Sequence, residues 1–368
     1  MPMKNGLPPA AWFDASIAPP LPWSGADAQA LHCVQIIKES ADVKTFVLAA
    51  SGRHFRYLPG QFLTLELQID GQAVNRCYTL SSSPTRPHLA AITVKRVTGG
   101  LVSNWLHDHM QAGSALQALG PAGEFSCFTR PAANYLFLAG GSGITPLMSM
   151  LRALHDLGAD ADVVLVQCAR TPDDLLFRDE LVLMAQRMPR WRLAWLCDGP
   201  GTRAGWTGPL GRLDAAMLAR IAPDVLTRDI YTCGPAPFMA SVREMLGQMR
   251  ADMGRYREES FAFAAPAVVD PPQQAPADAK AARYAVTLQK SGRRFECRGE
   301  QTLLQAALEA GVRLPHSCSS GACGTCKTQK LSGEVEMKHG GGIRPREEVQ
   351  GWVLPCCSRP LGDVVLDR

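Results

Sequence analysis

The hydrophobic positions of the first third of the chain alternate with polar ones over short runs, which is the period of β-strands. Gly and Pro separate these runs from one another. The predicted strands are 33–38, 43–49, 62–69, 77–81 and 91–97. One segment, 102–110, has a helical period instead. Closely spaced short strands are typical of a sandwich or a barrel, and we assign residues 29–131 to this domain.

The hydrophobic period changes after about residue 134. An apolar strand at 135–139 is followed by a glycine turn at 140–143 and an apolar-striped helix at 146–157. A second strand at 162–167 completes a βαβ unit, which predicts a parallel sheet in an α/β domain at 132–263. The later elements of this domain are predicted strands at 193–197 and 229–233 and helices at 178–186 and 237–249.

Two segments lack any regular period. Residues 1–28 are rich in Pro, Ala and Trp and are expected to form an irregular leader. Residues 264–282 are rich in Pro, Ala and Gln, which is typical of a semi-rigid linker. After this linker, residues 283–368 are expected to form a small domain with a hairpin at 284–297 and a helix at 305–310.

Composition and charge exclude several classes of protein. The 368 residues include 38 basic and 34 acidic ones, which are interspersed and give a net charge of +4. This balance argues against nucleic acid as a partner. No apolar run approaches the ~20 residues of a membrane span, and the first residues lack a secretory signal, so a cytoplasmic location is expected.

Five of the 12 cysteines lie in the last 51 residues, at positions 318, 323, 326, 356 and 357. Cys318, Cys323 and Cys326 have the spacing C-x4-C-x2-C, and Cys356 follows after 29 more residues. This is the pattern of plant-type [2Fe–2S] ferredoxins, in which four thiolates hold two irons. Small residues between the cysteines, such as Gly321, would let the backbone wrap closely around such a cluster.

Two alternatives remain open at the cysteine loop. Four cysteines can also hold a structural zinc ion, although zinc sites usually show two separate C-x2-4-C pairs. Either Cys356 or Cys357 could be the fourth ligand, and the spacing favours Cys356.

Two segments of the first domain carry groups that could bind a flavin nucleotide. Arg76, Tyr78 and Thr79 lie on one predicted strand, with Ser81 just beyond, and offer a phosphate clamp, an aromatic cover and hydroxyls. Gly100 and Ser103 stand at the start of the predicted helix, where backbone N–H groups and the helix dipole favour a pyrophosphate.

The second domain has a glycine-rich turn between its first strand and helix. Gly141, Gly143 and Thr145 occupy this turn, where α/β folds bind dinucleotide phosphates. Pro146 replaces the third glycine of the usual motif, and proline is well suited to the first turn of a helix. Cys233 and Gly234 form another turn at the same edge of the predicted sheet.

In this order the motifs resemble the ferredoxin–NADP reductase superfamily, and more narrowly its members with a C-terminal plant-type ferredoxin domain. The resemblance covers about residues 31–368. It implies a multidomain fold: an antiparallel β-barrel flavin domain, an α/β parallel-sheet nucleotide domain and an α+β β-grasp ferredoxin domain. Segments 102–108, 333–337 and 340–343 are most similar to the reductase components of glycine betaine monooxygenases, and hybrid-cluster protein reductases are similar too.

The resemblance implies roles for residues around the flavin. Arg76 would hold a flavin phosphate, Tyr78 would pack on the ring and Thr79 would hydrogen-bond near N5. Lys95 would lie in the strand that lines the flavin. Phe261 would stack on the ring, although Phe261-Ala-Phe departs from the Phe-Gly of many relatives.

The resemblance also implies the nucleotide sites. Val102 and Ser103 would bind the pyrophosphate of FAD, with FMN as the alternative. The residues that would line the nicotinamide nucleotide are Gly141, Gly143 and Thr145, with Cys233 and Gly234 near the nicotinamide ring.

The implied activity is electron transfer from NAD(P)H through the flavin and the cluster to a partner protein. The expected partner is a terminal oxygenase of the Rieske type that acts on glycine betaine or a similar quaternary amine. Arg170 could bind a 2′-phosphate, but Asp173 and Asp174 close by favour NADH over NADPH. The alternatives are a self-contained flavin reductase, a hybrid-cluster protein reductase and a zinc-containing interaction module.

Overall fold

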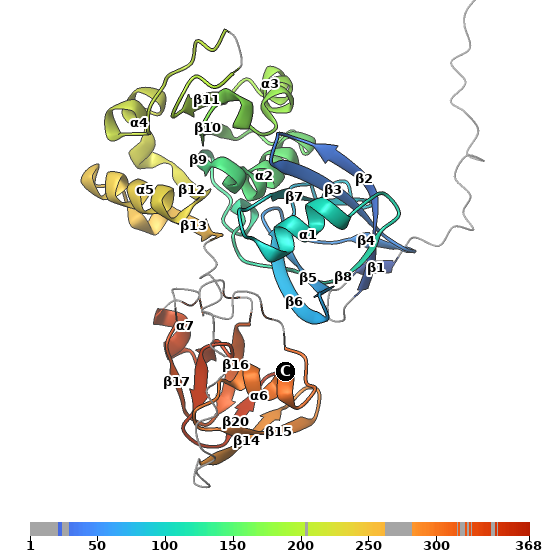
Figure 1. The fold of residues 1–368 in the computed structure, drawn as a ribbon. Helices are drawn as coiled ribbons and strands as arrows, with labels where there is room; N and C mark the ends of the chain where they lie inside the picture. Colours follow the sequence, from blue (N-terminus) through green and yellow to red (C-terminus); the bar gives the residue numbers. More distant parts are fainter. Residues whose placement is uncertain are drawn as a thin grey trace, which may run out of the picture.

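The computed structural model describes residues 21–23, 29–202, 205–261, 282–314, 316, 321, 324, 326–339, 343 and 345–368 (Figure 1). Within these residues the chain forms a β-barrel, a parallel α/β sheet and a smaller mixed sheet, in that order along the sequence. The predicted multidomain fold class is therefore confirmed. The predicted linker lies almost wholly outside the described residues.

The first domain is an antiparallel β-barrel. Its strands follow the order β6-β5-β8-β2-β3-β7, and a bridge between Leu80 and Ile92 joins the two outer strands. Helix α1 contributes Val102 and Leu106 to the barrel core. The elements are β2 (Gln29–Lys38), β3 (Val43–Ala50), β4 (Arg53–Phe55), β5 (Phe62–Ile69), β6 (Gln72–Thr79), β7 (Ala90–Lys95), α1 (Leu101–His109), β8 (Ala115–Ala122) and the 3-10 helix η2 (Cys127–Thr129).

One strand lies within the predicted leader. Strand β1 (Leu21–Trp23) pairs in parallel with β4, so residues 1–28 are not irregular throughout. The sequence pattern did not predict this strand, because three residues are too few to show a period.

The second domain is a parallel sheet of five strands in the order β11-β10-β9-β12-β13. Helices α2 and α3 pack on one face of the sheet, and α4 and α5 pack on the other. The elements up to β11 are β9 (Asn134–Gly140), η3 (Gly141–Gly143), α2 (Ile144–Asp156), β10 (Asp162–Ala169), η4 (Pro172–Asp174), α3 (Arg178–Arg187) and β11 (Trp191–Cys197). The remaining elements are α4 (Ala215–Ile221), η5 (Val225–Thr227), β12 (Asp229–Gly234), α5 (Ala236–Gln248), η6 (Met253–Arg255) and β13 (Tyr256–Ser260).

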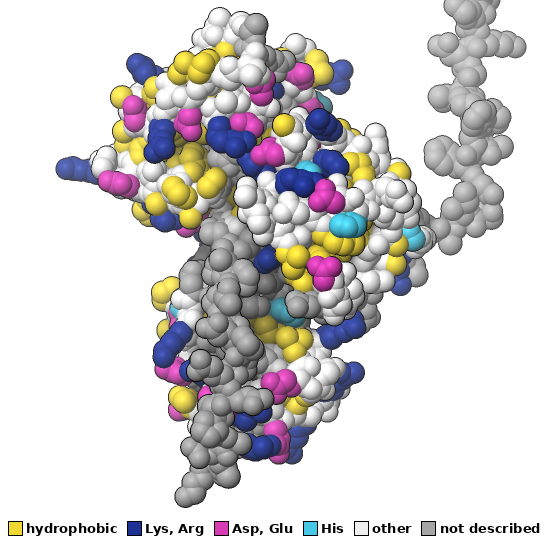
Figure 2. All heavy atoms as spheres, in the orientation of Figure 1, with side chains coloured by type: hydrophobic (Ala, Val, Ile, Leu, Met, Phe, Trp, Pro, Cys, Tyr) yellow, Lys and Arg dark blue, Asp and Glu magenta, His cyan; other side chains and the backbone are white. Residues whose placement is uncertain are grey.

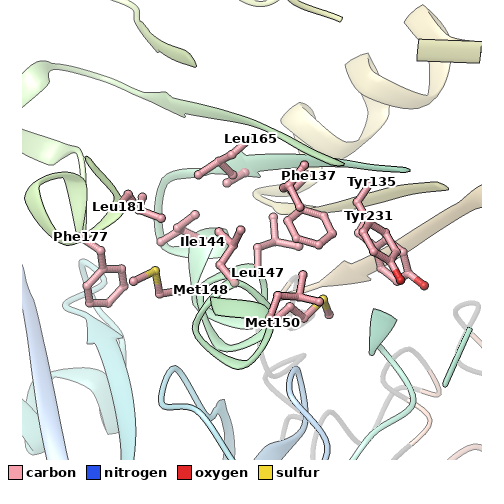
Figure 3. Packing of buried hydrophobic residues seen from close by; sticks show 14 of the residues in the cluster. Tyr135, Phe137, Ile144, Leu147, Met148, Met150, Leu165, Phe177, Leu181 and Tyr231 are labelled. Atoms are coloured by element: carbon pink, nitrogen blue, oxygen red, sulfur yellow. The ribbon is translucent and has the colours of Figure 1, made fainter. Parts of the chain in front are cut away.

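Helix α2 is buried because it lies between its own sheet and the barrel. Ile144 and Leu147 of α2 face Phe137 and Leu165 of the sheet (Figure 3). On its other side, the Ser149 hydroxyl donates to the carbonyl oxygen of Ser82 in the barrel domain at 2.6 Å. The predicted apolar-striped helix is thus buried on more than one face.

Further polar contacts join α2 to the barrel. Arg152 Nη1 donates to the Ser81 carbonyl oxygen at 2.6 Å. Near the end of the helix, Asp156 accepts hydrogen bonds from Thr85 and Arg86. The segment that carries the predicted flavin residues is therefore attached to the helix that follows the predicted nucleotide loop.

The third domain has a five-stranded mixed sheet in the order β15-β14-β20-β16-β18 and a separate pair, β17-β19. The predicted hairpin is confirmed, since β14 and β15 pair in antiparallel register. The elements are β14 (Arg283–Leu288), β15 (Arg293–Arg298), α6 (Leu303–Glu309), β16 (Thr328–Ser332), β17 (Val335–Met337), α7 (Pro345–Val349), β18 (Trp352–Val353), β19 (Ser358–Pro360) and β20 (Val364–Leu366). Cys326 and Cys356 belong to the core of this domain.

Charges of both signs are interspersed on the face of the molecule shown in Figure 2. None of the helices in the described part of the chain is long and apolar enough to cross a membrane.

Candidate functional site

Strand β6 carries most of the predicted flavin residues. Tyr78 is half-buried against the barrel core, and burial raises the pKa of its hydroxyl far above the ordinary value. The Thr79 hydroxyl donates to a carboxylate oxygen of Glu259 at 3.4 Å. Arg76 lies on the same strand, two residues before Tyr78. Residues of β6 and β13, far apart in sequence, thus meet at the end of β6.

Ser81 has a different environment from its neighbours. Its hydroxyl is fully buried in the barrel, where it hydrogen-bonds the Thr93 hydroxyl at 2.8 Å and donates to the Ala91 carbonyl oxygen at 3.2 Å. These contacts give the side chain a structural role, and its predicted contact with a cofactor stays a prediction.

Lys95 ends strand β7 beside an ionic network. Its ammonium group lies 3.4 Å from Asp42, which is also 3.2 Å from Arg170 of the second domain. Burial opposes ionisation of Asp42, but Lys95 and Arg170 together hold its pKa below the ordinary value. The predicted flavin lysine and the candidate 2′-phosphate arginine therefore share one carboxylate.

The turn before α1 is closed by a side chain. The Ser103 hydroxyl accepts a hydrogen bond from the Val97 N–H at 3.2 Å and donates to the Gly100 carbonyl oxygen at 3.4 Å. A Cβ at Gly100 would lie 2.6 Å from that hydroxyl oxygen, so the turn requires glycine there. Val102 is buried in the barrel core. The side chains of residues 102 and 103 shape the turn. The first backbone N–H groups of α1 have no acceptor within the helix, so they can donate to a pyrophosphate.

The glycine loop after β9 combines an open position and a crowded one. Gly141 has φ +53°, and nothing lies within 4 Å of where its Cβ would be. At Gly143 a Cβ would lie 2.2 Å from the Cys233 carbonyl oxygen. Thr145 is buried and donates to the Ser142 carbonyl oxygen at 3.1 Å. The loop can therefore approach β12 closely while its first residue leaves room for a ligand.

Cys233 is fully buried at the end of β12, next to Gly143. Burial raises the pKa of its thiol well above the ordinary value, and the nearby Glu259 carboxylate adds to this effect. The following residue, Gly234, also needs the absence of a side chain, because a Cβ there would lie 2.6 Å from the Phe238 ring. The thiol is thus held neutral at the sheet edge where α/β folds bind nucleotides.

Glu259 is the residue that the sequence analysis missed. In the parallel register of β12 and β13 it lies opposite Cys233, while its carboxylate accepts the hydrogen bond from Thr79. Phe261, two residues later, packs against the core of the nucleotide domain. The sequence shows an acidic pair just before Phe261. Only the strand register shows which of the two carboxylates lies beside Thr79 and Cys233.

The cluster loop is described in part. Cys326 and Cys356 are buried, with their sulfur atoms 3.2 Å apart, close enough to be ligands of one iron. Cys318 and Cys323 lie outside the described residues. Two of the loop glycines, Gly321 and Gly324, have φ values of +71° and +72°.

Cys357 takes a position different from that of its neighbour. Its thiol donates to the Leu354 carbonyl oxygen at 3.6 Å. A Cβ at Gly321 would lie 2.6 Å from its sulfur, so Cys357 packs behind the loop. These contacts support Cys356 as the fourth ligand. The buried pair of thiols and the positive φ angles of Gly321 and Gly324 fit a metal–sulfur group around which the backbone wraps.

A cavity of about 630 Å³ lies along the edge strand β11. The guanidinium of Arg178 lies over the rings of Trp195 and Trp206, at 5.3 and 5.5 Å from their centroids. None of the predicted site residues lines this cavity. It adjoins the start of α3, since Arg178 is the first residue of that helix.

Comparison with known proteins agrees with this arrangement. Family models match an oxidoreductase FAD-binding domain at residues 30–127, an oxidoreductase NAD-binding domain at 137–244 and a 2Fe-2S iron-sulfur cluster binding domain at 286–361. The fold and these sites define an oxidoreductase that contains FAD and a [2Fe–2S] cluster and uses a nicotinamide nucleotide.

Two relatives and one solved structure narrow the class. The chain is 43% identical to the glycine betaine monooxygenase reductase subunit of Pseudomonas aeruginosa, over 92% of this chain and 94% of the relative. It is 42% identical to the stachydrine N-demethylase reductase subunit of Rhizobium meliloti, over 94% of this chain and 97% of the relative. The solved structure of phthalate dioxygenase reductase aligns with 93% of this chain and with 98% of its own length, with a TM-score of 0.58 and 26% identity. The chain belongs to the family of oxygenase reductase subunits that these proteins represent.

Membership of this family confirms several expectations. The predicted FAD and the predicted [2Fe–2S] cluster are confirmed, because the matched domains are an FAD-binding domain and a 2Fe-2S cluster binding domain. The chain is an NAD(P)H-dependent reductase. Bound FAD would supply the change from two-electron to one-electron chemistry between the nucleotide and the cluster. The residues of the chain would therefore bind and orient these groups and would not need to supply an acid or a base.

Proposed function

We propose that the chain transfers electrons from NADH to a separate Rieske-type oxygenase that acts on glycine betaine or a similar quaternary amine. The observation that carries this proposal is the 43% identity over nearly the whole length of a glycine betaine monooxygenase reductase subunit. The three predicted domains, with boundaries at residues 29, 132 and 283, would hold FAD, the nicotinamide nucleotide and the cluster.

The proposed flavin site lies between the first two domains. Arg76 binds a flavin phosphate, Tyr78 and Phe261 cover the ring, and Lys95 lines its side. Thr79 is proposed to hydrogen-bond near flavin N5, and its contact with Glu259 supports a place for this hydroxyl at the domain junction. The pyrophosphate lies at the start of α1, at the backbone of Gly100, Val102 and Ser103.

The proposed nicotinamide site lies at the end of the parallel sheet. Gly141, Gly143 and Thr145 form its phosphate loop, and Cys233 and Gly234 face the nicotinamide. The uncharged thiol of Cys233 supports this placement, because a thiolate would place a negative charge beside the nicotinamide ring that gives up the hydride. The cluster is held by Cys318, Cys323, Cys326 and Cys356.

The proposed preference for NADH rests on the surroundings of Arg170. Its guanidinium lies 2.9 Å from Asp174 and 3.2 Å from Asp42. An arginine that two carboxylates already neutralise has little charge left for a 2′-phosphate. A cytoplasmic location is part of the same proposal, because this is where NADH is available and where cysteine thiols stay reduced.

Reconstitution with an oxygenase component tests this function. The purified chain, NADH and the oxygenase component of a glycine betaine monooxygenase are expected to consume glycine betaine together, and neither protein alone is expected to do so. Cys326→Ser is the matched variant, since it keeps the flavin domain and removes a cluster ligand. Turnover of betaine by the chain alone would contradict the proposal. Undiminished physiological activity after deletion of residues 264–368 would favour a self-contained flavin reductase.

A further inference from the structure

The side chain of Arg368 extends back from the end of β20 to the start of β16. Its Nη2 donates to the Lys327 carbonyl oxygen at 3.0 Å, and its Nε donates to the Thr328 hydroxyl at 3.2 Å. The Thr328 hydroxyl in turn donates to the carbonyl oxygen of Cys326 at 2.9 Å. A continuous chain of hydrogen bonds therefore connects the guanidinium to the backbone of a proposed cluster ligand.

The guanidinium is partly buried beside this ligand. Thr328 and Cys326 are each only 2% exposed. Burial lowers the pKa of Arg368, while the electrostatic effect of the neighbouring Cys326 works in the opposite direction. An arginine stays protonated in proteins even so, and the result is a permanent positive charge in a poorly solvated place.

No carboxylate in the described part of the chain lies within ion-pair distance of Arg368, and its hydrogen bonds go to neutral oxygens. The other charges close by are already paired. Lys327 lies 2.9 Å from Glu347, and Asp367 lies 2.9 Å from Lys290. Arg368 thus has no carboxylate at ion-pair distance among the described residues, and Asp367 acts on it only from beyond that distance.

We propose that Arg368 is a positioning residue that raises the midpoint potential of the cluster. Reduction adds one electron to the cluster and breaks no bond, so the reduced form has one more negative charge. A fixed positive charge stabilises this form more than the oxidised form. The cluster then accepts electrons from the flavin more readily. This inference rests on the proposed four-cysteine site.

The test is a potentiometric titration of the full-length, cluster-loaded protein with dithionite, in which EPR measures how much of the cluster is reduced. Arg368→Gln removes the charge and keeps a hydrogen-bonding group, and Arg368→Lys keeps the charge. The glutamine variant is expected to have a lower midpoint potential, by up to about tenfold in the one-electron equilibrium, or 59 mV. The lysine variant is expected to regain most of this shift. Arg283→Gln, which changes a distant exposed arginine paired with Glu296, is expected to match the wild type.

A second variant keeps the test valid if Arg368→Gln loses its cluster. Lys290→Gln leaves Arg368 in place but removes the ion-pair partner of Asp367, so the negative charge that already acts on Arg368 is no longer balanced. Its potential is expected to fall by less than that of Arg368→Gln.

Two results would overturn the proposal. One is an unchanged potential in a fully loaded Arg368→Gln, or in Lys290→Gln if the first variant cannot be loaded. The other is an equal shift in the glutamine and lysine variants, which would indicate a structural effect. Neither NADH nor an oxygenase enters this titration, so either result would leave the proposed function standing. Zinc without sulfide in the wild-type protein would overturn the four-cysteine cluster site as well.

Discussion

At the scale of single residues, three polar groups from two domains meet where the flavin and nicotinamide sites are proposed. Thr79 of the barrel hydrogen-bonds Glu259, and Glu259 lies opposite Cys233 in the strand register. Two of these were visible in the sequence because they belong to short motifs. Glu259 was not, since a carboxylate on a polar edge strand has no periodic or spacing signal, and only the pairing of β12 with β13 shows where it lies.

The crowding at Gly143 leads to the first prediction. Gly143→Ala would place a Cβ 2.2 Å from the Cys233 carbonyl oxygen, so the loop or β12 has to move. We expect a loss of about 1–3 kcal/mol in the free energy of unfolding and slower flavin reduction by NADH. Denaturant unfolding and stopped-flow absorbance measure the two effects.

Gly247→Ala is the control for this substitution. Gly247 lies in α5 with nothing within 4 Å of its Cβ position, so alanine there should stabilise the helix by about 0.5–1 kcal/mol. Equal effects of the two substitutions would contradict the proposed close packing of the loop on β12.

The second prediction concerns the thiol of Cys233. A cysteine with the usual pKa of about 8.5 is about one-quarter thiolate at pH 8, and the thiolate is the species that reacts with iodoacetamide. Because burial and Glu259 raise the pKa of Cys233 well above the ordinary value, its thiol stays neutral at this pH. We expect no alkylation of Cys233 at pH 8 in the folded protein and rapid alkylation in urea. Mass spectrometry of the peptide measures this, and fast labelling of the folded protein would show that the thiol is accessible or ionised.

At the scale of elements, the sequence pattern located those that bury an apolar face. Strands β3 and β5 and helices α2 and α5 lie within a few residues of their predicted positions. Strand β8 was missed because Gly120 and Pro121 interrupt it, and β13 because its residues are mostly polar. Both are held by pairing with neighbouring strands, which a local pattern cannot show.

Helix α2 is the element that connects the two sites. Arg152 donates to the Ser81 carbonyl oxygen at 2.6 Å and binds both carboxylate oxygens of Glu180, at 2.8 and 2.6 Å. We expect Arg152→Ala to lower the free energy of unfolding by about 1–2 kcal/mol, because it leaves a buried carbonyl unpaired. Flavin reduction by NADH should slow as well, since the barrel and the nucleotide loop lose a shared contact.

Arg190→Ala provides the comparison for Arg152. Its pair with Asp160 is exposed, with 45% and 86% of the two side chains accessible, and should contribute under about 0.5 kcal/mol. Thermal unfolding of both variants measures the difference. If Arg152→Ala were no more destabilising than Arg190→Ala, the contact between α2 and the barrel would not contribute as described.

At the scale of the whole molecule, the network of Lys95, Asp42, Arg170 and Asp174 spans two domains and bears on the choice of nucleotide. We expect kcat/KM for NADH to exceed that for NADPH by about tenfold, which corresponds to about 1.4 kcal/mol. Asp174→Asn should reduce this ratio because it frees Arg170 for a 2′-phosphate.

Asp160→Asn, at an exposed pair elsewhere on the surface, should leave the nucleotide ratio unchanged. Steady-state rates with both nucleotides measure the preference. A wild-type protein that used NADPH as well as NADH would contradict the proposed role of the two carboxylates.

The central claim is that electrons pass from the nucleotide through FAD to the cluster within this one chain. The most direct measurement is to add NADH to the anaerobic protein, with its iron and sulfide content known, and to record the visible and EPR spectra. We predict bleaching of the flavin together with a rhombic EPR signal from a reduced [2Fe–2S] cluster. Bleaching without a paramagnetic signal in a protein that contains full iron and sulfide would contradict the claim.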